Sequence, residues 1–177
     1  MEKNWDLVEV LRYSRHDWLN RLQLIKGNLD LDRMDCAKAV IDKIIIETQQ
    51  ESKLSNLKMP ELASQLLRAN WEGHHFTLEY EVLYEQQAEP VDETAITEWV
   101  AEFFSILDQS VEPYQENSLS ICLNQVEDGV SFNFDFSGII KETKLLGELL
   151  QKGSGLKISV RELTREELDV EVFVPFC

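Results

Sequence analysis

Positive charge is scarce in this chain of 177 residues, which has 17 Lys and Arg against 33 Asp and Glu and a formal net charge of −16. So acidic a protein is poorly suited to the phosphate backbone of DNA or RNA, and we expect no nucleic-acid partner. The deficit is uneven: residues 1–59 hold ten basic and ten acidic residues, whereas residues 60–177 hold seven and 23. This contrast predicts two functional parts that meet near residues 59 and 60.

Cysteine is also scarce. Cys36, Cys122 and Cys177 lie far apart and form neither a CxxC pair nor a metal-type cluster, a pattern typical of reduced thiols in a reducing compartment. The N-terminus lacks the apolar run of a signal peptide, and no stretch has the length and apolarity of a membrane span. We therefore expect a cytoplasmic protein with no membrane partner.

Hydrophobic residues make up 44% of the chain, enough for a packed core. Near the N-terminus they recur at intervals of three and four residues, which predicts a helix over residues 3–28 with one apolar stripe: Val8, Leu11, Trp18, Leu22, Ile25 and Leu29. Gly27 and Asn28 are expected to interrupt this helix. A second helix is expected over residues 36–57, with Asp35 as its N-cap. The short connection predicts an antiparallel hairpin.

A lone hairpin cannot bury two apolar stripes well. The simplest solution is a homodimer in which two hairpins form a four-helix bundle. The alternative is that the hairpin packs against residues 60–177 of its own chain. We favour the dimer.

The pattern changes after Pro60. Three helices are expected, over residues 60–72, 93–111 and 141–151, and five strands, over residues 76–82, 118–123, 130–136, 156–163 and 168–174. These elements predict a mixed sheet with helices on one side, and hence the α+β class. His74 and His75 precede the first strand without acidic or cysteine partners at ligand spacing, so we expect them to be structural or exposed.

His16 lies inside the first predicted helix. At about 100° per residue, it stands about 140° around the helix from the centre of the apolar stripe, on the solvent side. Arg12 and Asn20 lie one turn to either side of it, and Gln23 lies two turns away. This placement excludes a buried core histidine, but on geometry alone an ordinary surface histidine is the simpler interpretation.

Three features favour phosphate chemistry at His16. Neutral imidazole can attack a phosphoryl group without a separate base. The carboxylate of Asp17, the next residue, can orient the ring or stabilise its protonated form. The helix over residues 3–28 is locally basic, with Lys3, Arg12, Arg15, Arg21 and Lys26 against three acidic residues, which suits phosphate or an acidic partner surface.

Long segments of the chain resemble a known family. SRHDWLNRLQLIKGNL (residues 14–29), ESKLSNLKMPELA (51–63) and TLEYEVL (77–83) are similar, in order, to the sporulation initiation phosphotransferase B family of Bacillus-type spore formers. The similarity extends over nearly the whole chain. His16, Asp17 and Asn20 also resemble the phosphoacceptor helix of citrate- and fumarate-type sensor kinases.

The resemblance implies that residues 1–59 form a phosphoacceptor and dimerisation hairpin, and that residues 60–177 form a degenerate α/β sandwich like a histidine-kinase ATPase domain. His16 would carry phosphoryl from the aspartyl-phosphate of a single-domain response regulator to the aspartate of a transcription-factor response regulator. Arg12, Asp17, Asn20 and Gln23 would support the transfer or contact the receiver domains. Those domains would supply Mg²⁺, and the chain would need no cofactor of its own.

A sensor kinase would also need an ATP site. Kinase domains of this type use a helical asparagine to hold Mg²⁺ and phosphate, yet no asparagine occurs between Asn70 and Asn117. DFSGII (135–140) and GSGLKI (153–158) resemble adenine-site and lid motifs, which makes Asp135 and Gly153 candidate remnants, but we interpret the glycines as turn residues. Two alternatives stay open: a fragment of an ATP-dependent sensor kinase, and a non-catalytic dimeric scaffold that docks response regulators.

Overall fold

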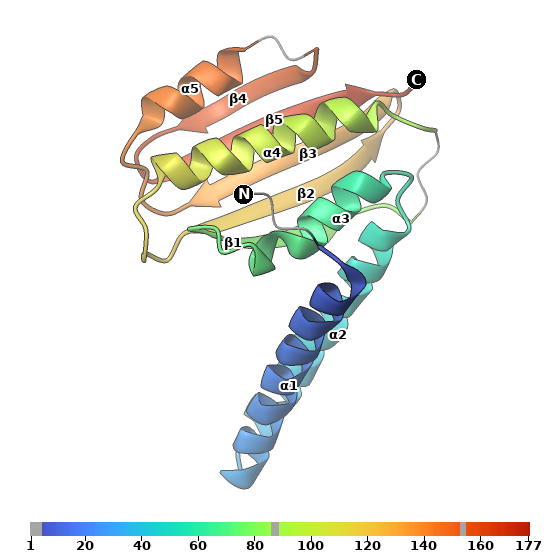
Figure 1. Ribbon diagram of the computed structural model, residues 1–177, viewed down its shortest axis with the longest axis vertical. Coiled ribbons are helices and arrows are strands. Elements are labelled where there is room, and N and C mark those ends of the chain that lie inside the picture. Colours follow the sequence, from blue (N-terminus) through green and yellow to red (C-terminus); the bar gives the residue numbers. More distant parts are fainter. Residues whose placement is uncertain (1–4, 86–88, 153–154) are drawn as a thin grey trace. The chain divides into compact units, whose positions relative to one another are not determined.

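The computed structural model describes residues 5–85, 89–152 and 155–177, and Figure 1 shows its helices and strands. The chain divides into two compact units, Met1–Gln49 and Gln50–Cys177. The first is helical and the second is a mixed sheet with helices, so the predicted α+β class is confirmed. No helix among the described residues combines the length and apolarity that crossing a bilayer requires.

The helical unit is an antiparallel hairpin. Helix α1 spans Leu7–Asp30 and is capped by the Asp6 carboxylate, which accepts a hydrogen bond from Glu9 N; α2 spans Met34–Ser55. The predicted break at Gly27 and Asn28 is wrong, because one glycine costs a helix only about 1 kcal/mol. Asp35 lies in the first turn of α2 instead of capping it, where its charge still favours the helix dipole.

One face of each helix packs against the other, and we call this contact the hairpin seam. On α1 its half-buried residues follow a spacing of three and four, and Arg21 Nη2 donates to Glu47 Oε2 of α2 across it at 2.8 Å. The seam comprises Val10, Ser14, Asp17, Arg21, Ile25 and Asn28 of α1, and Ala37, Val40, Ile44 and Glu47 of α2.

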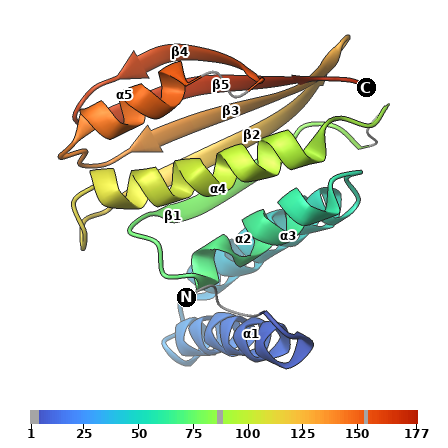
Figure 2. The ribbon, with the colours of Figure 1, turned by 45° about the horizontal axis from the view of Figure 1, so that its top comes forward.

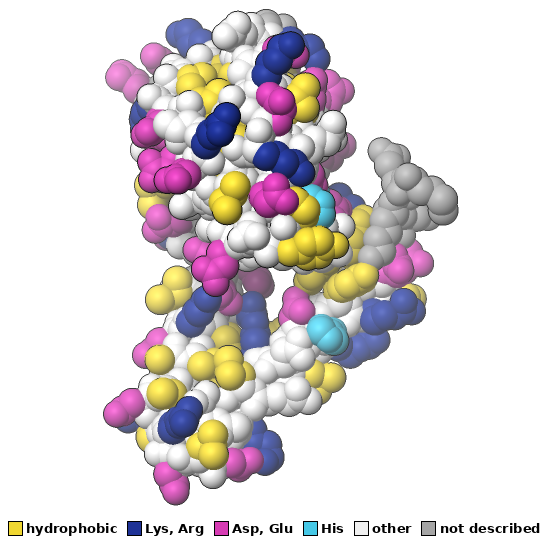
Figure 3. Space-filling view, turned by 90° about the vertical axis from the view of Figure 1, so that its left-hand side faces the viewer, with side chains coloured by type: hydrophobic (Ala, Val, Ile, Leu, Met, Phe, Trp, Pro, Cys, Tyr) yellow, Lys and Arg dark blue, Asp and Glu magenta, His cyan; other side chains and the backbone are white. Residues whose placement is uncertain are grey.

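A second, apolar face is left uncovered within the hairpin. We call it the outer apolar face, and it comprises Leu11, Trp18, Leu22 and Leu29 of α1 with Met34, Ile41 and Ile45 of α2, all of them exposed. On both helices it lies about 90° around the axis from the seam, in the same rotational sense. Because the helices are antiparallel, equal rotation places both halves on one side of the hairpin. Figure 3 shows hydrophobic side chains, in yellow, along the hairpin surface.

The second unit is a five-stranded sheet with its helices on one face (Figure 2). The strands lie in the order β1-β2-β3-β5-β4, with β1 parallel to β2 and the other pairs antiparallel. In chain order the elements are α3 (Pro60–Arg68), the 3-10 helix η1 (Ala69–Trp71), β1 (Thr77–Val82), α4 (Glu93–Ser110), β2 (Ser118–Val126), β3 (Gly129–Ser137), α5 (Thr143–Gln151), β4 (Lys157–Leu163) and β5 (Glu167–Pro175).

Alternation along the strands builds the core of this unit. Phe132, Phe134 and Phe136 of β3 are fully buried toward the helices, while Asp135 between them is exposed on the helix-free face. The rings of Trp99 and Phe103 of α4 stack on each other and meet Phe134 edge-on. Aromatic side chains therefore fill the space between α4 and the centre of the sheet.

Side chains cover the free edge of β1. Asn70 donates through Nδ2 to Leu78 O and accepts through Oδ1 from Leu78 N, each at 2.8 Å. At the other end of the strand, Val82 N donates to Gln50 Oε1 and Lys53 Nζ donates to Val82 O. An unpaired strand edge is a template for aggregation, and these three side chains take the place of a further strand.

Asn70→Ala should destabilise the second unit, because it removes both hydrogen bonds to Leu78. We expect a loss of about 1–2 kcal/mol in the free energy of unfolding, measured by urea denaturation, and faster exchange of the Leu78 amide hydrogen. Asn56→Ala, at an exposed asparagine just after α2, is the matched control and should change neither quantity. Equal stability of the two variants would contradict the edge-covering role of Asn70.

Candidate functional site

His16 projects from the middle of α1 with its side chain 71% exposed. Two neighbours meet the same ring nitrogen: Asn20 Nδ2 lies 3.2 Å from His16 Nδ1, and Asp17 Oδ1 lies 3.6 Å from it. Among the described residues neither neighbour engages Nε2. The ring is thus contacted at Nδ1 on a side chain that is largely exposed.

The position of His16 follows from the two packing faces of α1. Around the helix axis it lies about 140° from the centre of the seam and about 140° from the centre of the outer apolar face. It therefore faces away from both. Any partner that covers the outer apolar face leaves His16 accessible, and a rigid helix of 24 residues supports it.

The other predicted site residues divide into two groups. Arg12, Asn20 and Gln23 are exposed within about 40° of His16 around the axis. Asp17 is half-buried at the edge of the seam, so it reaches the ring from the side. Arg12 also approaches Glu9, at 3.9 Å.

Leu19 was missed by the sequence analysis. It is 57% exposed and lies one turn from His16, outside both the seam and the outer apolar face. The available signal was an apolar residue that lies off the stripe and one turn from His16. It adds an apolar contact to the otherwise polar surface around His16.

Comparison with known proteins identifies the family. The family model "Sporulation initiation phospho-transferase B, C-terminal" matches residues 58–175, and "Sensor_kinase_SpoOB-type, alpha-helical domain" matches residues 1–57. Sporulation initiation phosphotransferase B of Bacillus subtilis (strain 168) is 36% identical over 170 residues, which cover 94% of this chain and 88% of the relative. The chain belongs to the sporulation initiation phosphotransferase B family.

Solved structures similar to this phosphotransferase are more distant. Acinetobacter baumannii histidine kinase AdeS aligns with a TM-score of 0.48 and 11% identity, covering 91% of this chain and 98% of that one. A structure described as a bacterial phosphotransferase aligns with a TM-score of 0.42 and 13% identity, covering 96% and 98%. These similarities are too remote to assign roles to individual residues.

The second unit of the phosphotransferase has a histidine cluster that sequence spacing did not reveal. His74 Nδ1 pairs with Asp108 Oδ2 of α4, and His74 Nε2 lies 3.6 Å from Glu72 Oε2. The ring also stacks on Phe76, with centroids 4.9 Å apart. Asp108 is 34 residues away in the chain, so the absence of acidic partners at ligand spacing gave no sign of this pair. The expectation that His74 is structural agrees with its packing.

The motif over residues 135–140, which resembles an adenine site, lies at the end of β3 and just after it. Asp135 is exposed on the helix-free face of the sheet. A Cβ at Gly138 would lie 2.3 Å from Asn117 Oδ1, so this glycine makes room for the asparagine. Gly153 lies outside the described residues. Within the described ranges, no three His, Cys, Asp or Glu side chains are grouped as a metal site requires.

The His74 cluster predicts a pH dependence of stability. Burial lowers the pKa of His74, but the hydrogen bond and charge of Asp108 and the charge of Glu72 outweigh it, so the pKa lies above the usual 6.5. Its stabilising contribution is therefore complete below the unfolded-state pKa and is lost as pH rises through the folded-state pKa. The stability gap between wild type and His74→Gln should be wider at pH 5.5 than at pH 8.5 in urea denaturation.

His75→Gln, at the adjacent exposed histidine, is the control for this measurement. Comparing the two variants separates the loss of the His74–Asp108 pair from the general effect of changing a histidine to glutamine. A His74→Gln gap that stays constant or grows with pH would contradict the proposed pairing.

Proposed function

We propose that His16 of this sporulation phosphotransferase carries a phosphoryl group between two response-regulator receiver domains. It accepts the group from the aspartyl-phosphate of a single-domain response regulator and passes it to the aspartate of a transcription-factor response regulator. The observation that carries the proposal is the geometry of His16, whose side chain is largely exposed and is contacted at Nδ1, in a chain of this family.

The chemistry needs only one nucleophile from this chain. The Nε2 lone pair attacks phosphorus in line with the acyl phosphate, the P–O bond to the aspartate breaks, and the carboxylate leaves with the electron pair. An N–P bond replaces it, and the positive charge on the ring is balanced by Asp17. The second transfer is the reverse reaction with another aspartate. Positioning supplies most of the catalysis in such displacements.

Asp17 and Asn20 control which nitrogen reacts. A carboxylate near Nδ1 favours the tautomer with its proton on that nitrogen, which leaves the lone pair on Nε2. As observed, Asn20 Nδ2 can only donate to Nδ1, which suits the tautomer with its proton on Nε2. Transfer through Nε2 needs the Asn20 amide to turn, so that its oxygen accepts from the protonated Nδ1. Arg12 and Gln23, exposed on the same side, are placed to contact the incoming receiver, and Arg12 offers charge to its phosphoryl group.

The outer apolar face supports a homodimer. Each helix of a four-helix bundle packs against two neighbours, and both helices of this hairpin have two packing faces about 90° apart. A second hairpin laid on the outer apolar face buries Leu22 and Ile41, which are 56% and 42% exposed within one chain. His16 then points outward from the bundle on both protomers, and each receiver finds it on a rigid surface.

In this proposal the phosphoryl group on His16 comes from a receiver domain and not from ATP. Aromatic rings fill the space between α4 and the sheet, and the helix carries no asparagine to hold Mg²⁺ and phosphate. The excess of acidic residues over 60–177 adds an electrostatic cost for a nucleotide. The receiver domain supplies the Mg²⁺ together with its aspartate.

His16→Gln should accept no phosphoryl group, because the amide has no nucleophilic nitrogen, yet it should fold and dimerise. We expect at least about a 1,000-fold loss of transfer from a ³²P-labelled receiver, followed by gel autoradiography. His75→Gln, the same substitution at an exposed histidine of the second unit, should transfer at the wild-type rate.

Three outcomes would overturn the phosphotransferase proposal. Labelled ATP alone should leave the wild-type chain unlabelled, so self-labelling would indicate a sensor kinase. If the His16→Gln variant accepted the phosphoryl group as well as wild type, another residue would be the acceptor. A scaffold that only docks response regulators would bind the receiver without ever becoming labelled.

Leu22→Glu should separate the dimer, because it places a carboxylate in each half of a buried apolar interface. We expect roughly a 100-fold rise in the dimer dissociation constant, measured by sedimentation equilibrium. Ile46→Glu is the matched control, since Ile46 is 59% exposed on the opposite side of the hairpin from the outer apolar face. A dimer that tolerates Leu22→Glu as well as Ile46→Glu would contradict this interface.

A further inference from the structure

Tyr114 occupies a backbone position that ordinarily favours glycine. Its φ is +63°, and it follows Pro113 in the pattern of a type II turn, where glycine or asparagine is the usual residue. A bulky residue in this conformation is a genuine outlier. The side chain is also 96% exposed, so the ring gains almost no burial in return. Folding alone does not explain a tyrosine here.

The turn that carries Tyr114 is held rigidly by Asn117. This asparagine is buried, and its Nδ2 donates to His75 O and to Glu112 O, each at 2.8 Å. Its Oδ1 accepts from Ile139 N at 3.0 Å. Three segments of the chain are thus tied together by one side chain. A strained residue persists where its surroundings over-determine it, and such positions cluster at binding sites.

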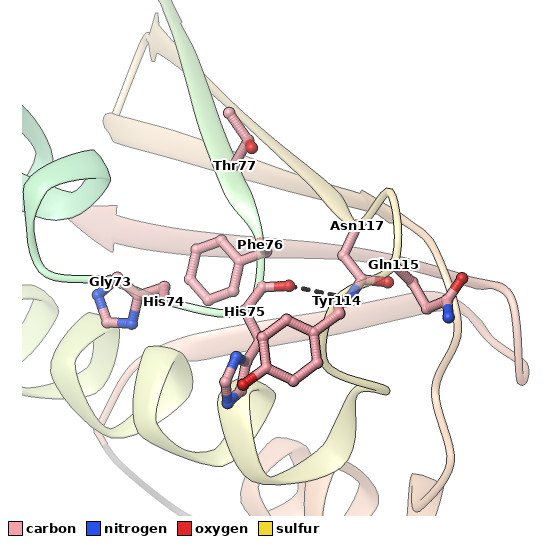
Figure 4. A pocket seen from close by; sticks show the side chains of 8 residues that line it. All are labelled: Gly73, His74, His75, Phe76, Thr77, Tyr114, Gln115 and Asn117. Atoms are coloured by element: carbon pink, nitrogen blue, oxygen red, sulfur yellow. Dashed lines mark hydrogen bonds between the residues drawn. The ribbon is translucent and has the colours of Figure 1, made fainter.

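Tyr114 and His75 form a cup (Figure 4). Their ring centroids lie 6.4 Å apart, with the planes tilted by 57°. The rings belong to a pocket of about 390 Å³, lined by Gly73, His74, His75, Phe76, Thr77, Tyr114, Gln115 and Asn117. The lining joins two aromatic faces with hydroxyl and amide groups, and a Cβ at Gly73 would meet open space.

The charge around the cup points to a cation. Glu112 and Glu116 lie in the same loop, and Asp108 accepts from His75 N at 2.8 Å. The eight described lining residues include no lysine or arginine. They do include His74, whose positive charge when protonated is balanced by its pairing with Asp108, so the uncompensated charge of the loop is that of Glu112 and Glu116. An anion would meet this acidic surface unfavourably, whereas a cation is attracted both by the carboxylates and by the faces of the aromatic rings.

We infer that the cup between His75 and Tyr114 is a docking site for an arginine side chain of a partner protein. A guanidinium is planar, so it can stack on the tyrosine face and donate hydrogen bonds to Gln115 and to backbone carbonyls of the loop. The rigid, pre-strained turn presents the tyrosine without an ordering cost at the moment of binding. The site is independent of His16 and of phosphoryl transfer.

The probe for this site is N-acetyl-L-arginine methylamide, titrated into the full ¹⁵N-labelled chain. Saturable shifts of the backbone amides of His75 and Gln115 are expected. The citrulline analogue has the same shape but no charge, and it should bind about two- to five-fold more weakly. Absence of shifts with the arginine compound, or equal binding of the citrulline compound, would overturn the inference.

Tyr114→Gly separates recognition from folding. Glycine adopts a positive φ without strain, so the midpoint of thermal unfolding should stay the same or rise, while the shifts at His75 and Gln115 disappear. Unchanged binding by this variant would contradict the docking role. A clear fall in the unfolding midpoint would show that the ring serves the fold, and would contradict it as well.

Discussion

The arrangement of the hairpin depends above all on the helical period of α1. The period places a seam of half-buried residues and a second apolar face about 90° apart, and His16 lies opposite the direction between them. A histidine on the seam would be covered by α2, and one on the outer apolar face would be covered by any partner packed there. The same period brings Asn20 under the ring, so that one turn of helix both exposes the imidazole and holds its Nδ1.

The second unit obeys a different constraint, namely that backbone groups at the ends and edges of a sheet need partners. Asn70 supplies both partners of Leu78 at the free edge of β1, and Asn117 ties His75, Glu112 and Ile139 together at its end. Gly138 is small because Asn117 occupies the space of its side chain. Amide side chains thus provide hydrogen bonds that a further strand would otherwise make.

The elements of the fold were largely predictable because their periods are strong. Alternation over Thr77–Val82 and Gly129–Ser137, and the helical pattern of α4, predicted the observed elements to within a few residues. The end of α1 was not predicted, because Gly27 is tolerated inside a long helix and the turn depends on Asp32, whose φ is +56°. The helix predicted to residue 72 tightens to a 3-10 turn from Ala69. Long-range pairings such as His74 with Asp108 leave no local pattern, and Leu19 lies off the apolar stripe, so the helical period does not single it out.

The central claim is that Nε2 of His16 receives the phosphoryl group. The direct measurement is ³¹P–¹⁵N correlation NMR on the ¹⁵N-histidine-labelled chain after incubation with a phosphorylated receiver domain. A single phosphorus signal coupled to Nε2 of His16, acid-labile and stable in base, is the predicted result. Phosphorus coupled to Nδ1 of His16, or to a nitrogen of His74 or His75, or no labelled histidine at all, would contradict it.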